Sequence, residues 1–185
     1  MRQPIKLMFL LIYFFPNQTT AQTTSSSGYI VTIGNEKVEG VVKLSPGEKG
    51  KLTFLSSENK RKVYTPSGIK SFSIDSINYI SYCNDFYEEV SAGLKAKLYK
   101  KITNYSGEKI YNDVEVVEFV KTMEGKRGDF YLLPATMTQL DLITKKNFRD
   151  YFSKLFNTND SLISKVKNGN LEYSQIKKAV ELYNE

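Results

Sequence analysis

Residues 28–44 read GYIVTIGNEKVEGVVKL, and the spacing of their apolar side chains predicts two adjacent β-strands. Tyr29, Val31 and Ile33 occupy alternate positions, and apolar residues alternate again in VEGVVKL. Residues two apart in a strand point to the same face, so each run has an apolar face. The intervening residues 34–37, GNEK, are typical of turns. The stretch therefore predicts an antiparallel β-hairpin.

The same kind of pattern continues outward from this hairpin to residue 143. Short runs rich in β-branched and aromatic residues are separated by clusters of Gly, Pro, Asn and Ser, the usual boundaries of strands. Residues 114–120 are mostly apolar, which favours a central strand. The predicted strands after the hairpin cover residues 52–55, 61–65, 69–74, 77–83, 86–90, 94–99, 114–120, 130–133 and 140–143.

The period lengthens after Thr144. Phe148, Tyr151, Phe152, Leu155 and Phe156 have the spacing of one helix face, and Thr144 is the expected N-cap. Residues 157–160 are expected to break this helix and to cap a second one, which Gly169 would end. Ser174 is the expected cap of a third helix.

These helices have apolar faces that need a partner, and the sheet is the only large one available. We therefore predict one α+β domain over residues 28–185. Its β region, residues 28–143, forms an antiparallel sheet or partly open barrel of about eight to ten strands. Its helical tail, residues 144–185, contributes two to three helices that pack on the sheet.

The chain begins with the three parts of a secretory signal peptide. Arg2 and Lys6 precede the apolar run LMFLLIYFF, and small residues end the segment at Ala21. Nine helical residues span only about 13–14 Å, against about 30 Å of membrane hydrocarbon, so cleavage is favoured over anchoring. Residues 1–21 are thus predicted to be a signal peptide cut after Ala21. Residues 22–27, QTTSSS, are predicted to be a disordered leader.

Composition narrows the chemistry open to the chain. Its 185 residues include no His and one Cys, which excludes a Ser-His-Asp or Cys-His triad and a Cys/His zinc site. The formal net charge of +6 falls to +4 when Arg2 and Lys6 leave with the signal peptide. We find no nucleotide-binding motif, no nucleic-acid motif and no second long apolar run. We therefore expect no cofactor, no nucleic-acid partner and no transmembrane span in the mature chain.

The one cysteine, Cys83, follows Ile77, Tyr79 and Ser81 in strand phase. This phase predicts a small buried side chain, because an unpaired cysteine behaves as a small apolar residue. Pairing with a cysteine of another chain is the alternative in an oxidising compartment.

Several stretches, taken together, resemble a known group of proteins. They are GYIVTIGNEKVEGVVKL at 28–44, YTPSGIKSF at 64–72, LKAKLYK at 94–100, NFRDYF at 147–152 and VKNGNLEYSQIKKAVELYNE at 166–185. The combination resembles uncharacterised exported β-rich proteins of Bacteroidota-type bacteria, which share such an opening hairpin and a helical C-terminus ending in Tyr-Asn. The resemblance implies a periplasmic, outer-envelope-associated or secreted location, and it implies no catalytic residue.

Two basic, tyrosine-containing segments form the candidate binding site. Their residues, which are predicted to share a face within each segment, are Lys60, Lys62 and Tyr64, and Lys95, Lys97 and Tyr99. Clustered positive charge attracts anions, so these faces are candidates for binding an anionic glycan or a lipid headgroup. The alternative is a solvated sheet face on which lysines protect a strand edge.

Carboxylates are the remaining candidates for catalysis. Glu88 and Glu89 are adjacent in a strand and should point to opposite faces. Asp113 and Glu115 would share a face about 7 Å apart, a separation compatible with an inverting glycosidase. Two acids near the start of a strand are more often a solvated edge, so catalysis is not favoured.

We therefore expect an exported, non-enzymatic protein that binds an envelope protein or an anionic glycan, or that gives structural support. A small envelope hydrolase using Asp or Glu is the alternative. Docking of the helical tail onto a larger envelope complex is the third hypothesis, which an exposed apolar helix face would support.

Overall fold

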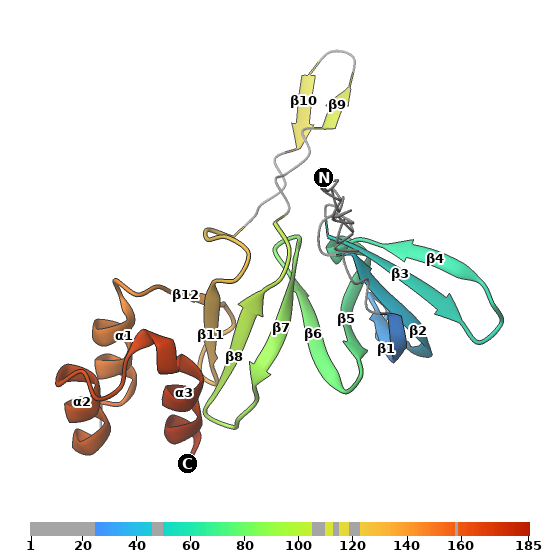
Figure 1. Cartoon of the computed structure of the whole chain (residues 1–185). Coiled ribbons are helices and arrows are strands. Elements are labelled where there is room, and N and C mark those ends of the chain that lie inside the picture. Colours follow the sequence, from blue (N-terminus) through green and yellow to red (C-terminus); the bar gives the residue numbers. More distant parts are fainter. Residues whose placement is uncertain (1–24, 46–49, 105–109, 113–114, 119–122, 158) are drawn as a thin grey trace, which may run out of the picture.

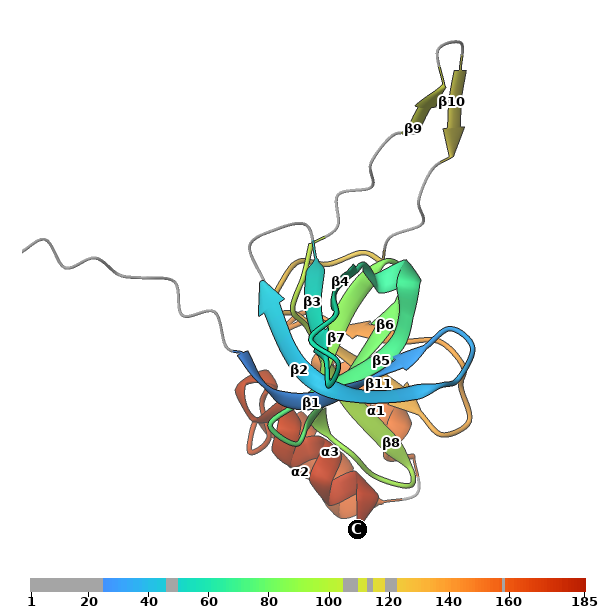
Figure 2. The ribbon, with the colours of Figure 1, turned by 90° about the vertical axis from the view of Figure 1, so that its right-hand side faces the viewer.

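The computed structural model describes residues 25–45, 50–104, 110–112, 115–118, 123–157 and 159–185. A ten-stranded antiparallel sheet runs in the order β12-β11-β8-β7-β6-β5-β1-β2-β3-β4 (Figure 1). The sheet curls strongly at the end that holds β1 to β6 but does not close (Figure 2). Three α-helices follow it in the chain and pack on it, so the predicted α+β class is confirmed.

The elements have the following bounds. The large sheet contains β1 (Ser25–Thr32), β2 (Lys37–Ser45), β3 (Lys51–Ser56), β4 (Arg61–Tyr64), β5 (Ile69–Ile74), β6 (Ile77–Tyr82), β7 (Asp85–Ser91), β8 (Ala96–Lys101), β11 (Phe130–Pro134) and β12 (Asp141–Ile143). A separate two-stranded sheet contains β9 (Ile110–Asn112) and β10 (Glu115–Glu118). The helices are α1 (Phe148–Leu155), α2 (Asp160–Lys167) and α3 (Ile176–Asn184), with 3-10 turns η1 (Pro66–Gly68) and η2 (Tyr173–Gln175).

The predicted opening hairpin is β1–β2, and the glycine in each of its strands explains how neighbouring strands approach so closely. Gly28 lies directly opposite Gly40. A Cβ atom on Gly28 would overlap the carbonyl oxygen of Ser73 in β5, and one on Gly40 would overlap that of Leu55 in β3. The absence of a side chain therefore lets β5, β1, β2 and β3 lie side by side at this level of the sheet.

Two expectations about strands are wrong. β1 begins at Ser25, and Ser26 and Ser27 pair with β2, so the predicted leader is strand from residue 25 onward. Ladder hydrogen bonds come from the backbone and do not need apolar side chains. The apolar run at 114–120 is not a central strand, because β10 pairs only with β9 within the described residues and lies apart from the large sheet (Figure 1). The signal segment, residues 1–21, lies outside the described residues.

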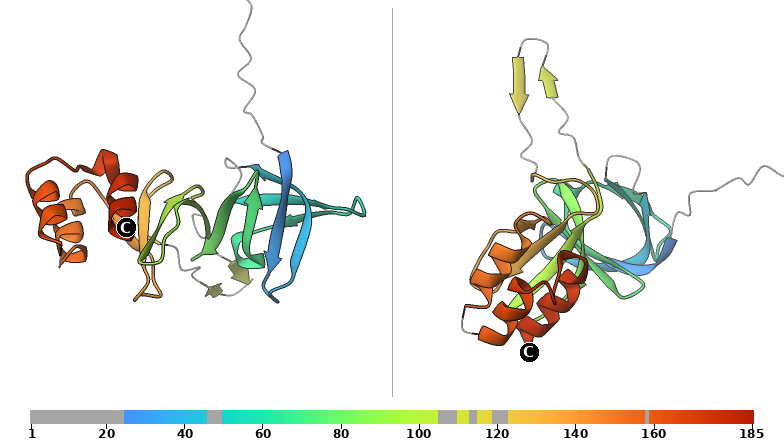
Figure 3. Two further views of the ribbon diagram at one scale, coloured as in Figure 1. Left: turned by 90° about the horizontal axis from the view of Figure 1, so that it is seen from below. Right: turned by 60° about the vertical axis from the view of Figure 1, so that its left-hand side comes forward.

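The large sheet buries two apolar clusters on one face. The first, called here the curl core, lies inside the curled end of the sheet and includes Ile30, Phe72 and Phe86. The second, called here the helix core, joins residues of β8, β11 and β12 to the helical tail. Figure 3 shows the helices gathered beside these strands, at the opposite end of the sheet from the curl. The helix core contains Ala96, Leu98, Leu132, Ile143, Phe148, Phe152, Phe156, Leu162, Val166, Leu171, Ile176, Ala179 and Val180. The predicted packing of the three phenylalanines against the β region is confirmed.

A single row of directly opposed residues connects the two clusters. Directly opposed residues of an antiparallel pair point to the same face, so this row lies on one face of the sheet. Its middle is charged, with Glu88 and Lys100 between the two apolar clusters. In sheet order the row is Val38, Ile30, Phe72, Tyr79, Glu88, Lys100, Phe130 and Ile143.

Helix α1 begins at Phe148, later than a cap at Thr144 predicts. The Asn147 N–H donates to Thr144 Oγ1 at 3.2 Å, and the Thr144 N–H donates to Asn147 Oδ1 at 2.7 Å. This reciprocal pair closes one turn ahead of the helix, so Thr144 does bind the backbone of the turn but does not adjoin the helix.

The other caps are partly as predicted. Asn159 caps α2, since its Oδ1 accepts the Leu162 N–H at 3.1 Å. Gly169, at φ 76°, follows the helix in the left-handed conformation that favours glycine. The expectation for Ser174 is wrong, because Glu172 and Gln175 form a reciprocal capping box before α3.

The last helical residue, Asn184, attaches α3 to the start of β8. Asn184 Oδ1 accepts the N–H groups of Lys95 and Ala96, both at 3.0 Å. Asn184 Nδ2 donates to the carbonyl oxygens of Ala96 and Val180, both at 3.0 Å. A Cβ atom on Gly93 would overlap the Asn184 amide. One side chain thus satisfies both backbone groups of Ala96, and a residue larger than glycine at position 93 would displace it.

We predict that Asn184→Ala lowers the free energy of unfolding by about 1–3 kcal/mol, because it leaves half-buried backbone groups at the start of β8 without partners. Asn184→Asp keeps the acceptor and loses the donor, so it should have an intermediate effect. Denaturant unfolding measures both changes. Asn170→Ala, at an exposed asparagine, is the control, and equal midpoints for Asn184→Ala and Asn170→Ala would contradict the prediction.

Candidate functional site

The six predicted Lys and Tyr residues do not form one surface. Lys62 and Tyr64 lie on β4, the last strand at one end of the sheet, and Lys60 lies in the turn before it. Lys97 and Tyr99 lie on β8, the third strand from the other end, and Lys95 precedes that strand. Figure 1 shows β4 and β8 well apart. The two basic segments are therefore separate.

Local contacts already occupy several of these side chains. Lys60 Nζ lies 2.7 Å from Glu58 Oε2, and Lys62 Nζ lies 4.8 Å from the centre of the Tyr64 ring. Lys97 Nζ lies 3.7 Å from Glu89 Oε2.

Tyr99 is 3% exposed, so its predicted place on an open binding face is wrong. Burial, with the nearby Glu89 carboxylate, raises the pKa of Tyr99, and its hydroxyl donates to Glu89 Oε2 at 3.4 Å. Tyr99 instead belongs to a buried cluster with Tyr87 and Tyr131 on the face opposite the curl core. The alternation that placed Lys97 and Tyr99 on one face is correct, but that face is covered at Tyr99.

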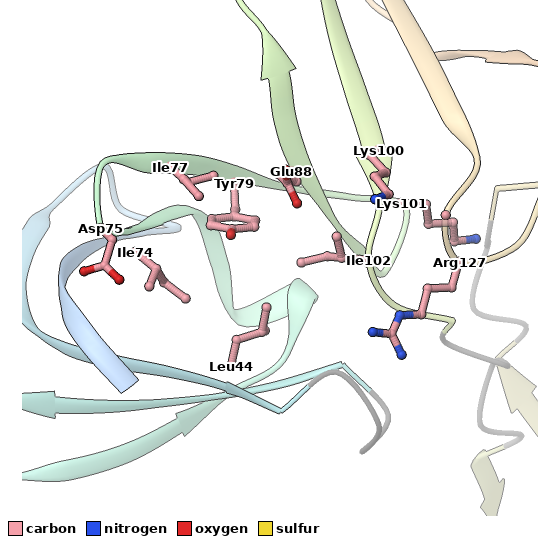
Figure 4. Close-up of a pocket in the computed structure, with 11 residues that line it drawn as sticks. Leu44, Ile74, Asp75, Ile77, Tyr79, Glu88, Lys100, Lys101, Ile102 and Arg127 are labelled. Carbon is pink, nitrogen blue, oxygen red and sulfur yellow. The ribbon is translucent and has the colours of Figure 1, made fainter. Parts of the chain in front are cut away.

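The structure contains a cavity that sequence analysis did not find. It measures about 610 Å³ and lies where the row of opposed residues becomes charged, between the curl core and the helix core (Figure 4). Its volume falls within the ~300–1,000 Å³ usual for ligand sites. The lining residues are Leu44, Ile74, Asp75, Ile77, Tyr79, Glu88, Lys100, Lys101, Ile102, Arg127 and Gly128.

Apolar side chains form much of the cavity wall. Leu44, Ile74 and Ile102 continue the curl core into it, and Ile77 is 44% exposed beside it. Tyr79 packs its ring on Phe72 at a centroid distance of 4.6 Å. Burial, followed by the negative charges of Glu88 and Asp75, raises the pKa of Tyr79 to about 12. The Tyr79 hydroxyl is therefore protonated at neutral pH and can donate a hydrogen bond.

Charged side chains complete the cavity wall, two of them from neighbouring strands and two from turns. Glu88 and Lys100 are half-buried and directly opposed on β7 and β8. Asp75, in the β5–β6 turn, and Arg127, in the turn before β11, are exposed. Figure 4 shows Asp75 on one side of the space and Arg127 reaching in from the other. The cavity can thus offer hydrogen-bond acceptors and donors above an apolar floor.

A buried ion pair on the reverse face of the sheet fixes the turn that carries Arg127. Lys101 Nζ lies 2.9 Å from Asp85 Oδ2, and the two side chains are 3% and 0% exposed. Lys101 Nζ also donates to the carbonyl oxygens of Met123 and Gly125, at 3.2 and 3.3 Å. The backbone adds the Gly128 N–H, which donates to the Lys101 carbonyl oxygen at 2.8 Å. Lys101 therefore positions the turn while its ammonium group points away from the cavity (Figure 4).

The structure tests the expectation for one of the two predicted pairs of acids, Glu88 and Glu89. Glu88 lines the cavity, whereas Glu89 bonds to Tyr99, so the two adjacent glutamates do point to opposite faces. Asp113 lies outside the described residues, and its pairing with Glu115 stays a prediction. Within the described part of the chain, no group of three or more His, Cys, Asp or Glu side chains has the arrangement of a metal site.

Cys83 is not a buried strand residue. It is half-buried and has φ 43°, and with Asn84 at φ 62° it forms the two-residue turn between β6 and β7. Two successive positive φ values are characteristic of the tight hairpin turn that matches strand twist. The in-phase spacing from Ile77 therefore extended the strand one residue too far.

The residues that line the cavity had only a weak signal in the sequence. Glu88 and Lys100 become neighbours only through the register of β7 on β8, and Arg127 reaches the space through a loop. The available signal was that two predicted neighbouring strands carry charged residues, Glu88 within one and Lys100 directly after the other, which could face each other.

No helix in the described ranges is long and apolar enough to cross a membrane. Comparisons of the chain with family models, with curated proteins and with solved structures found no match. The cavity is therefore the feature from which function is inferred.

We predict that Lys101→Met destabilises the fold by about 3–5 kcal/mol, because it leaves a buried carboxylate without its cation. Adding Asp85→Asn should recover part of this loss, giving a coupling energy in a double-mutant cycle. Lys100→Met, at the neighbouring lysine that faces the cavity, is the control and should cost far less. Equal melting temperatures for Lys100→Met and Lys101→Met would contradict the role given to the buried pair.

Proposed function

We propose that the chain is an exported, non-enzymatic binding protein that takes a small molecule with an apolar body into the cavity between its two cores. The observation that carries this proposal is the cavity itself, with an apolar floor of Leu44, Ile74 and Ile102 and with charged groups around it. Apolar walls with a few placed polar groups are the usual composition of ligand sites.

Export is part of the same proposal. It is supported by the charged, apolar and small-residue segments of residues 1–21 and by the resemblance to exported proteins of Bacteroidota-type bacteria. A periplasmic, outer-envelope or secreted protein would meet envelope polymers. The separate lysine segments at 60–62 and 95–97 would then give weak, salt-sensitive contacts with an anionic glycan or an envelope protein.

The cavity also bears on the hydrolase alternative, since it holds two carboxylates, Asp75 and Glu88. Figure 4 shows the ring of Tyr79 between them. Asp75 is exposed in a turn, whereas Glu88 is half-buried in β7. A pair of glycosidase carboxylates flanks the scissile bond from two sides of a shared space. The aromatic ring between these two acids favours binding over hydrolysis.

Cleavage of the leader is directly testable. Protein recovered from the envelope or medium of an exporting bacterium should begin at Gln22, and intact-mass analysis would detect this. Replacing Leu10 and Leu11 by Arg should abolish export, because the apolar run would be broken. Recovery of the uncut chain from the inner membrane would contradict the prediction.

Ligand entry can be tested with a general probe for apolar sites. We predict that 8-anilinonaphthalene-1-sulfonate binds the mature chain and that Ile77→Trp, which fills the cavity wall, weakens binding by about tenfold, equivalent to ~1.4 kcal/mol. Val63→Trp is the matched control, because Val63 is 50% exposed on β4 and does not line the cavity. Titration calorimetry measures both affinities. Failure of the probe to bind, or equal effects of the two substitutions, would contradict the proposed function.

A further inference from the structure

The charges around the cavity are separated by sign. The acids, Asp75 and Glu88, belong to the side built by the β5–β6 turn and β7. The cations, Lys100 and Arg127, belong to the side built by β8 and the turn before β11. Figure 4 shows the hydrophobic side chain of Ile102 in the space between Asp75 and Arg127. Asp75 and Arg127 therefore lie on opposite sides of an apolar centre, and Glu88 and Lys100 lie next to each other on the wall between them.

Glu88 and Lys100 both face the cavity but do not form an ion pair with each other. They are directly opposed across β7 and β8, yet no ion pair within 4.0 Å connects them. On the reverse face of the same two strands, Glu89 does contact Lys97 at 3.7 Å and accepts the Tyr99 hydroxyl. The geometry of β7 and β8 thus allows ion pairs between the two strands, but Glu88 and Lys100 on the cavity face do not form one.

Half-burial makes this arrangement costly for the empty protein. A charge that is partly removed from water loses solvation, and the loss is offset only by an opposite charge or by hydrogen bonds. A ligand that brought only an anion would satisfy Lys100 and would desolvate Glu88 further. A ligand that brought only a cation would do the reverse. A ligand with both charges would offset both losses.

We propose that the ligand is a zwitterion with an apolar body, of about the size of a short apolar peptide. Its ammonium group would lie toward Glu88 and Asp75, and its carboxylate toward Lys100 and Arg127. The apolar body would lie on Ile74, Ile102 and the ring of Tyr79. The Arg127 guanidinium suits a carboxylate because its planar fork donates two parallel hydrogen bonds. This inference rests on the proposed function and specifies the ligand of the same cavity.

Three related dipeptides separate the two charges. Leucyl-leucine carries both, N-acetyl-leucyl-leucine carries only the carboxylate, and leucyl-leucine amide carries only the ammonium. We expect leucyl-leucine to bind most tightly to the mature chain in titration calorimetry at neutral pH. Each blocked dipeptide should bind at least about tenfold more weakly, since a half-buried charge of the protein loses its partner.

Two substitutions assign each end of the ligand. Glu88→Gln should weaken binding of leucyl-leucine and its amide by about tenfold and should not weaken binding of the acetylated form. Lys100→Gln should weaken binding of leucyl-leucine and the acetylated form and should not weaken binding of the amide. Lys62→Gln, at an exposed strand lysine outside the cavity, is the control and should change none of the three affinities. Unchanged melting temperatures would show that the variants remain folded.

The outcomes distinguish this inference from the proposed function. If the aromatic sulfonate binds and Ile77→Trp weakens it, but the blocked dipeptides bind as well as leucyl-leucine, the cavity binds apolar molecules and the zwitterion is wrong. Absence of binding by all three dipeptides, with the sulfonate still bound, overturns the zwitterion in the same way. If neither the sulfonate nor any dipeptide binds, both proposals are wrong. Equal effects of Glu88→Gln on all three dipeptides would also overturn the orientation.

Discussion

The register between neighbouring strands is the constraint on which the rest of the molecule depends. Each antiparallel pair fixes which residues are directly opposed, and opposed residues share a face. A slip of one residue between β7 and β8 would place Glu88 on the opposite face from Lys100. The same slip would expose Phe86 or Leu98, which are fully buried in the two cores. Burial of the cores therefore determines the positions of the charged residues between them.

Contacts far apart in the sequence maintain this register. Asn184, at the end of α3, binds both backbone groups of Ala96 at the start of β8. The buried pair of Lys101 and Asp85 holds the other end of β8 to β7 on the reverse face. Thr103 adds a hydroxyl that donates to Asp85 at 2.9 Å and accepts the Phe86 N–H at 2.9 Å. Polar contacts at both ends of β8 thus fix the strand that carries Lys100.

Local patterns in the sequence were sufficient for most of the fold. Alternation predicted the opening hairpin, and the 148–156 spacing predicted the buried face of α1, because each pattern reports burial within one element. The failures have a common origin. The apolar run at 114–120 predicted burial but held no information on its partner, which is β9. Likewise, Cys83 continued the alternation of β6 although the backbone had already turned.

The candidate site was less predictable than the fold, for the same physical reason. Lys62 and Lys97 each stand on a correctly predicted strand, but their separation depends on the strand order of the whole sheet. The cavity depends on contacts between residues even farther apart in the sequence, since Leu44, Glu88 and Arg127 come from three separate parts of the chain. The opposite orientation of Glu88 and Glu89 was predictable, whereas the residues near each glutamate were not.

The charged middle of the row is best understood as a departure from maximum stability. Apolar residues at 88 and 100 would let the row bury continuously from Phe72 to Phe130 and would join the curl core to the helix core. Burying a leucine-sized side chain contributes about 1.5–3 kcal/mol, whereas a half-buried charge without a partner is unfavourable. Residues that lower the stability of the empty protein are characteristic of sites that act on another molecule. The cavity lies between the two cores, and the opposed charges of Glu88 and Lys100 form part of its wall.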